Sequence, residues 1–470
     1  MIQAETIAAI ATPPGRGGIG IIKVSGPLSI PIAEKIFRRN AAGSGSESGP
    51  VGKLKTYRLY YGRIVVPDST ITLDEVLLAV MKAPRSYTRE DVVEIQGHAG
   101  PAALKSILAL ILEQGARLAE PGEFTRRAFL NGRIDLTQAE AVADIINART
   151  DAALLVAANQ VSGRLATAIE RIKTTLVAVL AEIEAEIDFP EDAQGAFDRQ
   201  RAADLLGSRV VSPVKDLIER YAREHLIRDG LRIIIVGRPN VGKSSLLNCL
   251  VNKDRAIVTA TPGTTRDLIE EELQIQGIPV TAIDTAGLHV TDDPIEKIGI
   301  ARAEERMDNA DLVLFVLDAG GPLTGEDFRI RTRIADKNSI VVLNKIDLLN
   351  GQRSDNAVLP IRWQNQPFAA VSALTGQGIP SLKKLIVRTA VGEMGGRAEH
   401  AVLPNLRHEM ALRSCLQFLD AVCSGIQDDA PAELIAMDLG ESIRWLDRIT
   451  GTEPSVDVLD QIFSQFCIGK

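Results

Sequence analysis

The stretch LRIIIVGRPNVGKSS, Leu231 to Ser245, has the composition of a strand, a phosphate-binding loop and the start of a helix, in that order. Its apolar first half ends at Gly237, and GRPNVGKS fits the spacing G-x-x-x-x-G-K-S. In such a loop the backbone N–H groups surround phosphate oxygens, Lys243 reaches the β- and γ-phosphates, and the Ser244 hydroxyl binds Mg²⁺. A chance glycine-rich turn is the alternative, and motifs further along argue against it. We therefore expect a P-loop domain with a doubly wound, mostly parallel sheet.

Three downstream motifs indicate which nucleotide binds. DTAG (Asp284 to Gly287) follows an apolar run, so its carboxylate lies at a strand end, where it can hold Mg²⁺ through water. In NKID (Asn344 to Asp347) the last carboxylate can accept both adjacent N–H donors of guanine, which adenine lacks. SAL (Ser372 to Leu374) would offer a backbone N–H to guanine O6. Together these motifs predict a GTPase. The predicted GTP contacts are Asn240, Val241, Gly242, Lys243, Ser244, Ser245, Thr259, Ala260, Thr261, Pro262, Gly263, Thr264, Thr265, Asp284, Thr285, Ala286, Gly287, Asn344, Lys345, Asp347, Ser372, Ala373 and Leu374.

The residue after DTAG is Leu288, which cannot orient a water as the glutamine of many GTPases does. The threonine-rich segment TATPGTTRD (Thr259 to Asp267) precedes DTAG, and Thr265 is a natural second Mg²⁺ ligand. One interpretation is a cage for a monovalent cation that replaces an arginine finger; the other is a polar loop whose threonines serve as turn residues. The residues alone leave both open. The oxygens of such a cage would belong to Asn240, Thr259, Thr261 and Thr264.

Length and composition bound the rest of the chain. Its 470 residues are enough for about three domains, and 53 basic against 61 acidic residues give a net charge of −8. This balance argues against a broad nonspecific nucleic-acid surface but allows a local basic patch. The four cysteines form no C-x-x-C pair, and the five histidines have no zinc spacing. With no apolar run of about 20 residues and no signal-peptide pattern at the start, we expect a cytoplasmic protein with no membrane contact.

The N-terminal block and the helical segments divide the chain into domains. Short apolar runs with Gly and Pro punctuation, together with two helical runs, predict an α+β domain over 1–135. Its GRGG favours a hairpin turn, with a phosphate cradle as the alternative. Helical periodicity predicts a helical domain in two parts, 136–229 and 391–470, interrupted by an inserted G domain at 230–390. Cys415 and Cys423 share a helical face and fit core packing.

The chain ends with FCIGK, in which a thiol, a glycine and a terminal lysine follow one another. A frayed terminus is the default interpretation of such an end. In the N-terminal block, Glu94 and His98 of VEIQGH and Arg133 of LNGRIDL lie at element ends, where solvated loop residues are common.

Several stretches together carry a resemblance that extends over nearly all of the chain. They are ATPPGRGGIGIIKVSG, EDVVEIQGH, PGEFTRRAFLNGRIDLTQAEAVADII, IDFPED, GRPNVGKSSLLN, GTTRD, DTAGL, EKIGI and CIGK. The phosphate loop and DTAG occur in many GTPases, whereas PGEF-x-x-RAFLN and CIGK are close to diagnostic. The chain resembles the MnmE (TrmE) family of bacterial tRNA-modification GTPases. The resemblance implies an N-terminal tetrahydrofolate-binding and dimerisation domain and a C-terminal tail that reaches the folate site.

The resemblance also implies roles for individual residues. K⁺ would be bound by Asn240 and the threonine-rich loop, and K⁺ would drive pairing of the G domains across a homodimer. Glu296 of PIEKIGI would position the attacking water, which Leu288 cannot do. Cys467 would be a nucleophile or acid–base group near the folate, with Lys470 lowering its pKa. The residues implied for folate binding are Lys23, Glu94, Arg133 and Lys470.

Three positions depart from the pattern of the family. Lys23 stands where relatives can have Arg, and Arg133 stands where they can have Lys. Both changes keep the charge but alter the donor geometry. Arg89 stands where a glycine is common, which puts the conformation of that turn in question.

The implied function is GTP-dependent addition of a carboxymethylaminomethyl group to C5 of the wobble uridine of certain tRNAs. The partner would be the FAD-binding protein MnmG (GidA), in a heterotetramer. Tetrahydrofolate, in its 5,10-methylene or 5-formyl form, would supply the one-carbon unit, glycine or ammonium would supply the nitrogen, and the flavin of the partner would carry out the redox step. Mg²⁺ and K⁺ would bind at the G domain.

Two other functions share some of these features. A ribosome-assembly GTPase of the Era/EngA type has the same G motifs but needs a basic RNA-binding module such as a KH domain, and no such module is visible in the sequence. A folate-dependent methyltransferase with a regulatory G domain would form its product without a flavoprotein.

Overall fold

The computed structural model describes residues 5–40, 54–189, 197–251, 270–284, 310–349, 359–391, 403–452, 454 and 456–470. Contacts divide the chain into two units. Unit 1 comprises Met1–Ala143 and Leu446–Lys470, and unit 2 comprises Asp144–Trp445. The predicted domain boundaries stay a prediction. The contacts also group the last part of the chain with the N-terminal unit.

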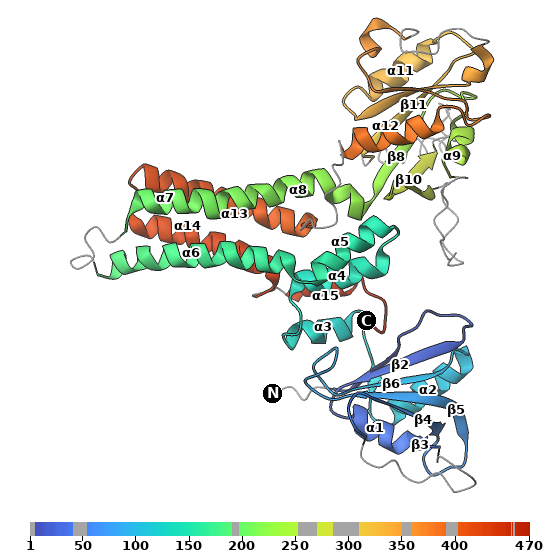
Figure 1. Ribbon diagram of the computed structural model, residues 1–470, viewed down its shortest axis with the longest axis vertical. Coiled ribbons are helices and arrows are strands. Elements are labelled where there is room, and N and C mark those ends of the chain that lie inside the picture. Colours follow the sequence, from blue (N-terminus) through green and yellow to red (C-terminus); the bar gives the residue numbers. More distant parts are fainter. Residues whose placement is uncertain are drawn as a thin grey trace, which may run out of the picture. The chain divides into compact units, whose positions relative to one another are not determined.

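Unit 1 is built on a seven-stranded sheet of order β3-β4-β5-β6-β2-β1-β7 (Figure 1). Its neighbouring strands are antiparallel except for the parallel pair β1 and β7. The inward side chains of the strands pack with α1 and α2 into one apolar core, as the alternation of a half-buried sheet requires. The elements are β1 (Ile7–Ile10), β2 (Ile19–Ser25), α1 (Ser29–Ile36), β3 (Phe37–Arg39), β4 (Arg58–Val65), β5 (Thr72–Met81), β6 (Val92–His98), α2 (Pro101–Glu113), β7 (Arg117–Leu118), α3 (Glu123–Leu130), α4 (Leu136–Asn147), which continues into unit 2, and α15 (Val456–Phe463).

The G-domain sheet of unit 2 has six strands in the order β13-β12-β11-β8-β10-β9, and only β9 is antiparallel to its neighbour. Helices α9 and α12 pack on one face and α11 on the other. Central strands covered on both faces are apolar throughout, as LVLFVL in β11 is. The expected doubly wound fold is confirmed. Its elements are β8 (Leu231–Val236), α9 (Lys243–Val251), β9 (Glu270–Ile275), β10 (Ile278–Asp284), β11 (Leu312–Asp318), α11 (Gly325–Arg333), β12 (Ser339–Asn344), η2 (Ile346–Leu349), η4 (Ile361–Trp363), β13 (Phe368–Ala370) and α12 (Ile379–Val391).

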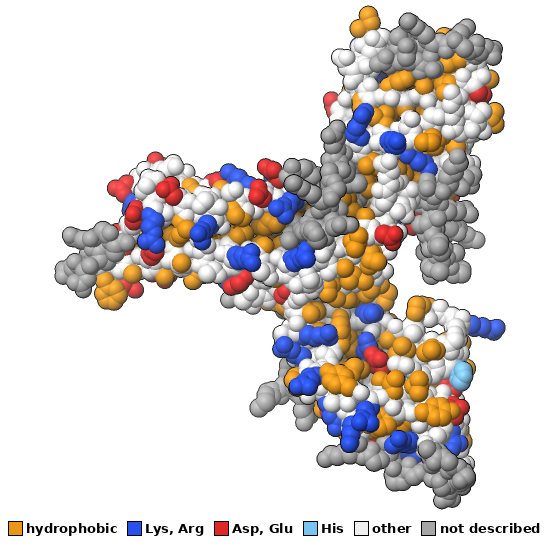
Figure 2. All heavy atoms as spheres, in the orientation of Figure 1, with side chains coloured by type: hydrophobic (Ala, Val, Ile, Leu, Met, Phe, Trp, Pro, Cys, Tyr) orange, Lys and Arg blue, Asp and Glu red, His pale blue; other side chains and the backbone are white. Residues whose placement is uncertain are grey.

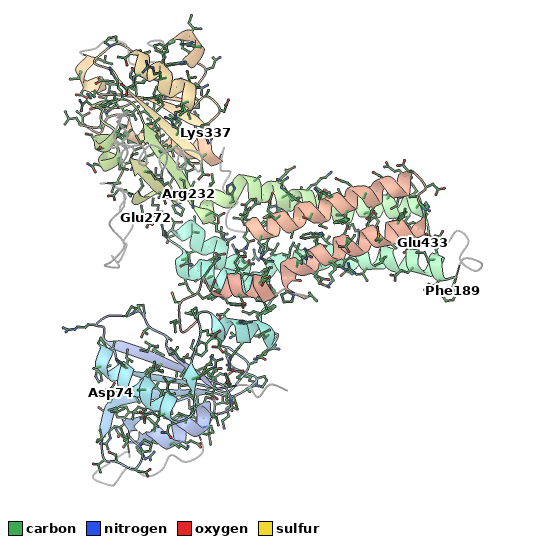
Figure 3. The ribbon with its side chains drawn as sticks, turned by 180° about the vertical axis from the view of Figure 1, so that it is seen from behind. Asp74, Phe189, Arg232, Glu272, Lys337 and Glu433 are labelled. Carbon is green, nitrogen blue, oxygen red and sulfur yellow. The ribbon has the colours of Figure 1, made fainter. Side chains whose placement is uncertain are left out.

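Long helices flank the G domain in sequence. Helix α8 leads into β8, and α13, which follows the G domain, packs against α8 (Figure 1). Figure 3 shows Phe189 at the end of α6, the longest of these helices. The elements are α5 (Asp151–Val161), α6 (Arg164–Asp188), α7 (Arg199–Leu206), the π-helix η1 (Gly207–Val211), α8 (Ser212–Asp229), α13 (Leu406–Gln427) and α14 (Ala432–Thr450), which continues into unit 1.

The length and apolarity of the helices bear on whether one of them could span a membrane. Among the described helices none is by itself long and apolar enough to cross a bilayer, and the bent pair α5 and α6 meets the requirement by length and composition only.

Candidate functional site

The candidate nucleotide site lies at the carboxyl ends of the parallel strands β8, β10, β11 and β12. In the sheet register Asp284 pairs with Ile235, and Asp318 pairs with Asn344. The strand ends therefore meet at one edge of the sheet, which is the edge where open α/β sheets bind ligands. The phosphate-loop, DTAG and NKID motifs all begin there.

The backbone of the phosphate loop has conformations and close contacts that only glycine allows. Gly237 has φ 158°, and Gly242 has φ 94°. A Cβ atom on Gly237 would lie 2.5 Å from the Val316 carbonyl oxygen, and one on Gly242 would lie 2.3 Å from Asn344 Nδ2. Asn240 has φ 62°, a left-handed conformation that asparagine tolerates better than most residues. Helix α9 begins directly after this loop, so the positive end of its dipole lies at the loop, where an anion is favoured.

The Lys243 ammonium lies against the carbonyls of this loop. Its Nζ donates to the carbonyl oxygen of Gly237 at 2.9 Å and to that of Arg238 at 3.1 Å. Both acceptors are neutral, so phosphate oxygens would be stronger acceptors for the same charge. The loop residues thus fit a nucleotide phosphate.

The predicted guanine-binding residues are joined to the phosphate loop by hydrogen bonds. The buried Asn344 donates from Nδ2 to the Val241 carbonyl at 2.9 Å, and its Oδ1 accepts from the Ala373 N–H at 3.0 Å. Asp347 Oδ1 accepts from the Ser372 hydroxyl at 2.5 Å. One side chain therefore ties together the phosphate loop, NKID and SAL, and the Asp347 carboxylate is held in place for a base.

A further residue of this site, Asp318, has no place in the sequence-based expectations. Lys345 Nζ donates to Asp318 Oδ2 at 2.7 Å and to the Asn240 carbonyl at 2.6 Å. Burial raises the pKa of Asp318, but hydrogen bonds from Lys345 and from the Gly320 N–H outweigh burial and hold the pKa below its ordinary value. The available signal was its position, because a carboxylate at the end of an apolar strand points to a site at that edge.

Some predicted nucleotide and metal ligands lie outside the described residues. They are Thr259, Ala260, Thr261, Pro262, Gly263, Thr264, Thr265, Thr285, Ala286, Gly287 and the catalytic candidate Glu296.

The predicted folate residues meet in unit 1. Lys23 on β2 is the direct register partner of Glu94 on β6. Lys23 Nζ lies 5.4 Å from the ring centroids of Tyr87 and Phe124, and the Arg133 guanidinium carbon lies 4.7 Å from the Tyr87 centroid. The sequence-based expectations omit both aromatic residues, although Phe124 is part of the PGEF motif. Two cations around aromatic faces fit an anionic, planar ligand.

Burial and neighbouring charges change the pKa of Lys23. Burial lowers the pKa of Lys23, the Glu94 carboxylate raises it, and the Lys470 charge lowers it further. Burial also raises the pKa of Tyr87, against the effects of a hydrogen bond to Thr125 and the Arg133 charge. Glu94 and Lys470 are thus within electrostatic reach of Lys23, and Arg133 is within reach of Tyr87.

The chain end is seated in unit 1, so the frayed-terminus interpretation is wrong. The Lys470 carbonyl accepts from the Phe124 N–H at 3.2 Å. Gly469 has φ 98°, and a Cβ atom there would lie 2.7 Å from the Ile10 carbonyl oxygen. Phe466 packs in an apolar cluster with residues of α4 and α15. These contacts seat the tail beside Phe124 and Ile10, and its role at a folate site stays a prediction.

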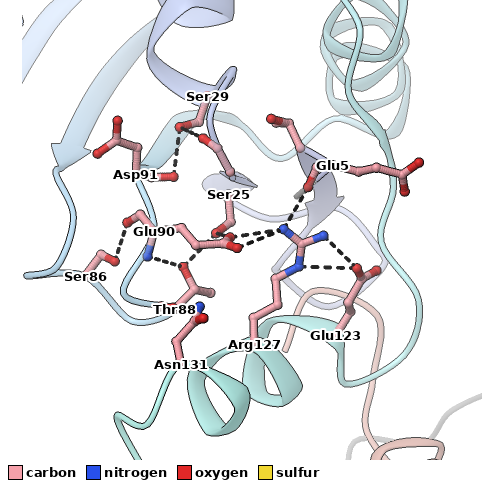
Figure 4. A network of polar contacts seen from close by, with 12 residues as sticks. Glu5, Ser25, Ser29, Ser86, Thr88, Glu90, Asp91, Glu123, Arg127 and Asn131 are labelled. Carbon is pink, nitrogen blue, oxygen red and sulfur yellow. Dashed lines mark hydrogen bonds and ion pairs between the residues drawn. The ribbon is translucent and has the colours of Figure 1, made fainter. Parts of the chain in front are cut away.

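A network of polar side chains joins β2, the turn before β6 and α3 (Figure 4). The Arg127 guanidinium donates to both Glu90 oxygens, at 3.2 and 3.1 Å, and to Glu123 Oε1 at 2.9 Å. The Ser25 hydroxyl donates to Glu90 Oε2 at 2.7 Å. Burial raises the pKa of Glu123, but hydrogen bonds from Arg117, from a backbone N–H and from Arg127 lower it to about 2. These charge pairs fix α3, the helix that carries Phe124.

The turn at Arg89 keeps a conformation typical of glycine. Arg89 has φ 60°, and its Nη1 donates to the Asn131 carbonyl at 2.9 Å. The Asn131 side chain in turn donates to the Thr88 carbonyl at 2.7 Å. The departure at this position therefore leaves the turn intact and adds a hydrogen bond toward the segment that carries Arg133.

The cysteines and His98 have simpler surroundings. Cys415 is fully buried, and burial raises its pKa to about 12, whereas Cys467 is exposed. His98 is exposed at the end of β6, where its hydrogen bond with Asp74, 2.7 Å long, raises its pKa. The loop at Gly15 joins the antiparallel strands β1 and β2, as a hairpin does.

Comparisons with known proteins cover both units. A model of the MnmE helical domain matches residues 136–467, and a model described as the GTP-binding protein TrmE N-terminus matches residues 6–133. The tRNA modification GTPase MnmE of Carboxydothermus hydrogenoformans is 43% identical over 100% of both chains, and that of Moorella thermoacetica is 45% identical over 99% of each. Among solved structures, Aquifex aeolicus Era is 27% identical over 40% of this chain and 66% of that chain, with a TM-score of 0.29. The full-length identity to these relatives shows that the chain belongs to the MnmE family of tRNA modification GTPases.

Proposed function

We propose that this chain is a K⁺-dependent GTPase that, together with the FAD-binding protein MnmG, adds a carboxymethylaminomethyl group to C5 of the wobble uridine of certain tRNAs. Family membership gives the coarser statement, a GTP hydrolase that acts in tRNA modification. The observation that carries the finer proposal is that one chain combines a guanine-type site at Asn344 and Asp347 with a cationic, aromatic site at Lys23.

At the nucleotide site, the geometry supports recognition of GTP. The Asp347 carboxylate, oriented by Ser372, would accept the two guanine N–H donors, and Lys243 would pair with the β- and γ-phosphates. Ser244 and Thr265 would hold Mg²⁺, which supplies charge neutralisation at the phosphates when bound.

For hydrolysis, we propose that Glu296 orients the attacking water, because Leu288 has no hydrogen-bonding group. K⁺ would supply the positive charge that an arginine finger supplies elsewhere. The left-handed conformation of Asn240 supports this role, because its carbonyl is already held by Lys345 while its side chain stays at the exposed side of the loop. The proposed K⁺ ligands are Asn240, Thr259, Thr261 and Thr264.

At the second site, Lys23, Arg133 and Lys470 would pair with the carboxylates or ring oxygen of tetrahydrofolate, and Glu94 would accept from its amino groups. Tyr87 and Phe124 offer faces on which its ring could stack. The ligand would supply the one-carbon unit. A cation that burial already destabilises gains more from an anionic ligand than a fully solvated cation does.

Exposed apolar side chains on the sheet of unit 1 support a homodimer. Tyr61 on β4 lies directly opposite Leu77 on β5, and Leu59 follows two residues along on the same face. Their exposed fractions are 53%, 39% and 62%, respectively. Figure 2 shows hydrophobic side chains gathered on the visible face of this unit. Such patches mark interaction surfaces, and pairing of two copies here would allow their G domains to meet in the K⁺ and GTP state.

Reconstitution tests the proposed function. The purified chain is incubated with an MnmG protein, unmodified tRNA, GTP, K⁺, methylene-tetrahydrofolate and glycine, and the wobble uridine is analysed by nucleoside mass spectrometry. We expect the carboxymethylaminomethyl product only when every component is present. Product without the flavoprotein would favour the folate-dependent methyltransferase, and no product from the complete mixture would contradict the proposal.

The role of Cys467 has its own test. Cys467 is exposed two residues before Gly469, which seats the tail. If its thiol acts on the folate-bound carbon, Cys467→Ser should abolish tRNA modification while GTP turnover stays within about twofold of wild type. Cys423→Ser, at a partly buried position in α13, is the matched control. Full modification by the Cys467 variant would refute a chemical role.

A further inference from the structure

A pocket in the helical part of unit 2 has no role in the function proposed above. It has a volume of about 660 Å³ and is lined by residues of α6, the π-helix η1 and α8. Its apolar part includes the buried side chains of Ile172 and Leu217. Three arginines, Arg171, Arg209 and Arg220, also line it. The volume is in the range of ligand-binding pockets, about 300–1,000 Å³.

The three pocket arginines differ from three arginines of α7 and α8 that are paired with carboxylates. Among the described residues, none of the three guanidinium groups has a hydrogen bond or an ion pair. Three further arginines of this segment are each paired with a carboxylate. The pairs are Arg199 with Asp429, Arg201 with Glu182, and Arg228 with Asp144.

The charge of the pocket is positive. Asp216 also lines it, so the lining carries three positive charges and one negative charge. No carboxylate of the described residues lies within ion-pair distance of the three guanidiniums. The pocket therefore has donors available for an anion that binds from outside the chain.

The hydroxyl groups of the lining are already hydrogen-bonded. The hydroxyls of Thr174 and Ser208 donate to the carbonyls of Glu170 and Asp204, at 2.8 Å in each case. The free donors toward a ligand are therefore the guanidiniums, whose planar geometry suits phosphate oxygens.

The π-helix contributes two of the lining residues. Ser208 and Arg209 belong to η1, while Val210 of the same turn is fully buried. A π-helical turn is rare and occurs frequently at functional sites. Here the turn places a guanidinium at the pocket while its neighbour remains in the core.

We propose that this pocket binds the sugar–phosphate backbone of the tRNA, which places a tRNA contact on the helical part of the chain. The inference rests on the proposed function. A chain with a net charge of −8 repels a polyanion on average, so it needs local sites at which unpaired cations meet phosphates. Three guanidiniums beside an apolar floor meet that need, since the floor can also accept the carbon face of a ribose.

Salt-dependent tRNA binding tests the pocket. Binding of fluorescein-labelled tRNA to the full chain is followed by anisotropy between 50 and 200 mM KCl, a range in which counterion release is measurable. The test variant carries Arg171→Gln, Arg209→Gln and Arg220→Gln. We expect its affinity to fall about tenfold or more, and the slope of log K against log salt to become shallower by about 2, because each lost phosphate contact removes about 0.7–0.9.

Two further variants distinguish an effect of the pocket from a general loss of positive charge and from a loss of folding. The matched control carries Arg329→Gln, Lys384→Gln and Arg388→Gln, three exposed cations of α11 and α12, and removes the same charge. Its slope should stay within about 0.5 of wild type. The second variant replaces the three pocket arginines by lysine, which keeps the charge, so it should keep most of the slope and lose part of the affinity.

The outcomes distinguish the two proposals. Equal affinity and slope for the pocket variant and the matched control would overturn the pocket proposal and leave the proposed function standing. If the wild-type chain itself fails to bind tRNA at 50 mM KCl, a salt concentration at which phosphate contacts are strong, the pocket proposal falls, whereas the proposed function falls only if reconstitution with MnmG gives no product.

Discussion

The nucleotide site and the proposed folate site would bind their charged ligands in different ways. The nucleotide site uses the backbone: Gly237, Asn240 and Gly242 hold φ values above +60°, and one buried asparagine joins the motifs. The proposed folate site uses side chains from distant parts of the chain, with Lys23 and Lys470 at its two sequence extremes. The first is thus specified by local sequence, and the second depends on the fold of unit 1 and on the seating of the tail.

This difference has an energetic side. The phosphate loop offers backbone dipoles and one lysine, and its residues with positive φ carry a conformational cost. At the proposed folate site burial lowers the pKa of Lys23, the Glu94 carboxylate raises it, and the like charge of Lys470 lowers it further. An anionic ligand would gain binding free energy at such a site, because it relieves the repulsion between the neighbouring cations. Substitutions should accordingly act on one site without acting on the other.

The largest expected effect is on base recognition. Asp347→Asn should lower GTP affinity by about 10³-fold and shift preference toward xanthosine triphosphate, because the amide can donate to the xanthine C2 oxygen. Isothermal titration calorimetry with both nucleotides measures it. Ser372→Ala, which removes only the hydrogen bond that orients the carboxylate, should cost about tenfold. Unchanged GTP affinity in the Asp347 variant would contradict the assignment, and 5-formyl-tetrahydrofolate binding should not change.

The next effect is on the chemical step. Glu296→Ala should slow GTP hydrolysis by about 10²-fold and leave GTP affinity near wild type, as expected for loss of a water-orienting group. Single-turnover hydrolysis and nucleotide binding are measured side by side. Glu326→Ala, an exposed acid in the first turn of α11, is the control and should hydrolyse GTP normally. Normal turnover by the Glu296 variant would remove it from the catalytic role.

A smaller effect, confined to the other site, should follow loss of the tail. Removing residues 467–470 should weaken binding of 5-formyl-tetrahydrofolate by about 10²-fold, because it removes a charge and the main-chain contact with Phe124. Lys470→Gln, which keeps the contact, should weaken it by about tenfold. GTP hydrolysis should persist in both variants. Equal folate affinity in wild type and the shortened chain would show that the tail does not belong to the site.

The smallest effect is on local stability. Glu123→Gln should lower the free energy of opening of α3 by about 2 kcal/mol at pH 7, since it replaces a carboxylate bonded to two arginines. The wild-type carboxylate has a pKa of about 2, below its unfolded value, so its contribution is present above pH 4.5 and is lost as the pH falls toward 2.

Hydrogen exchange of the α3 amides measures this opening. The difference between wild type and Glu123→Gln should therefore shrink across that acid range. Glu5→Gln is the matched control, because Glu5 is an exposed partner of Arg117 and should change the free energy by less than about 1 kcal/mol. A difference that is constant with pH would contradict the charge-based explanation.

The same comparison explains what could be predicted from the sequence. The residues from Gly237 to Ser245 form a continuous motif whose geometry follows from its order, so the nucleotide site and the doubly wound sheet could be predicted. The pairing of Lys23 with Glu94 depends on the antiparallel register of β2 and β6, which no local pattern contains. Those residues entered through the family resemblance, whereas Tyr87 and Asp318 emerged only from the fold.

A missed strand and the chain end also show what the sequence alone could not predict. β4 has no counterpart in the sequence-based expectations, although LYYGRIV alternates between exposed and buried positions as an edge-side strand does. A terminus is ordered only by its tertiary contacts, such as those of Gly469 with the Ile10 segment, so a frayed end was the natural expectation.

The most direct test of the account is GTP hydrolysis by the purified protein in K⁺ and in Na⁺ buffer at matched ionic strength, with light scattering to follow the dimer. The account predicts strong acceleration in K⁺ alone, accompanied by pairing of G domains within a constant homodimer, and loss of that acceleration in Asn240→Ala. Equal rates in both salts would contradict the cation cage and would assign the missing catalytic charge to a partner protein.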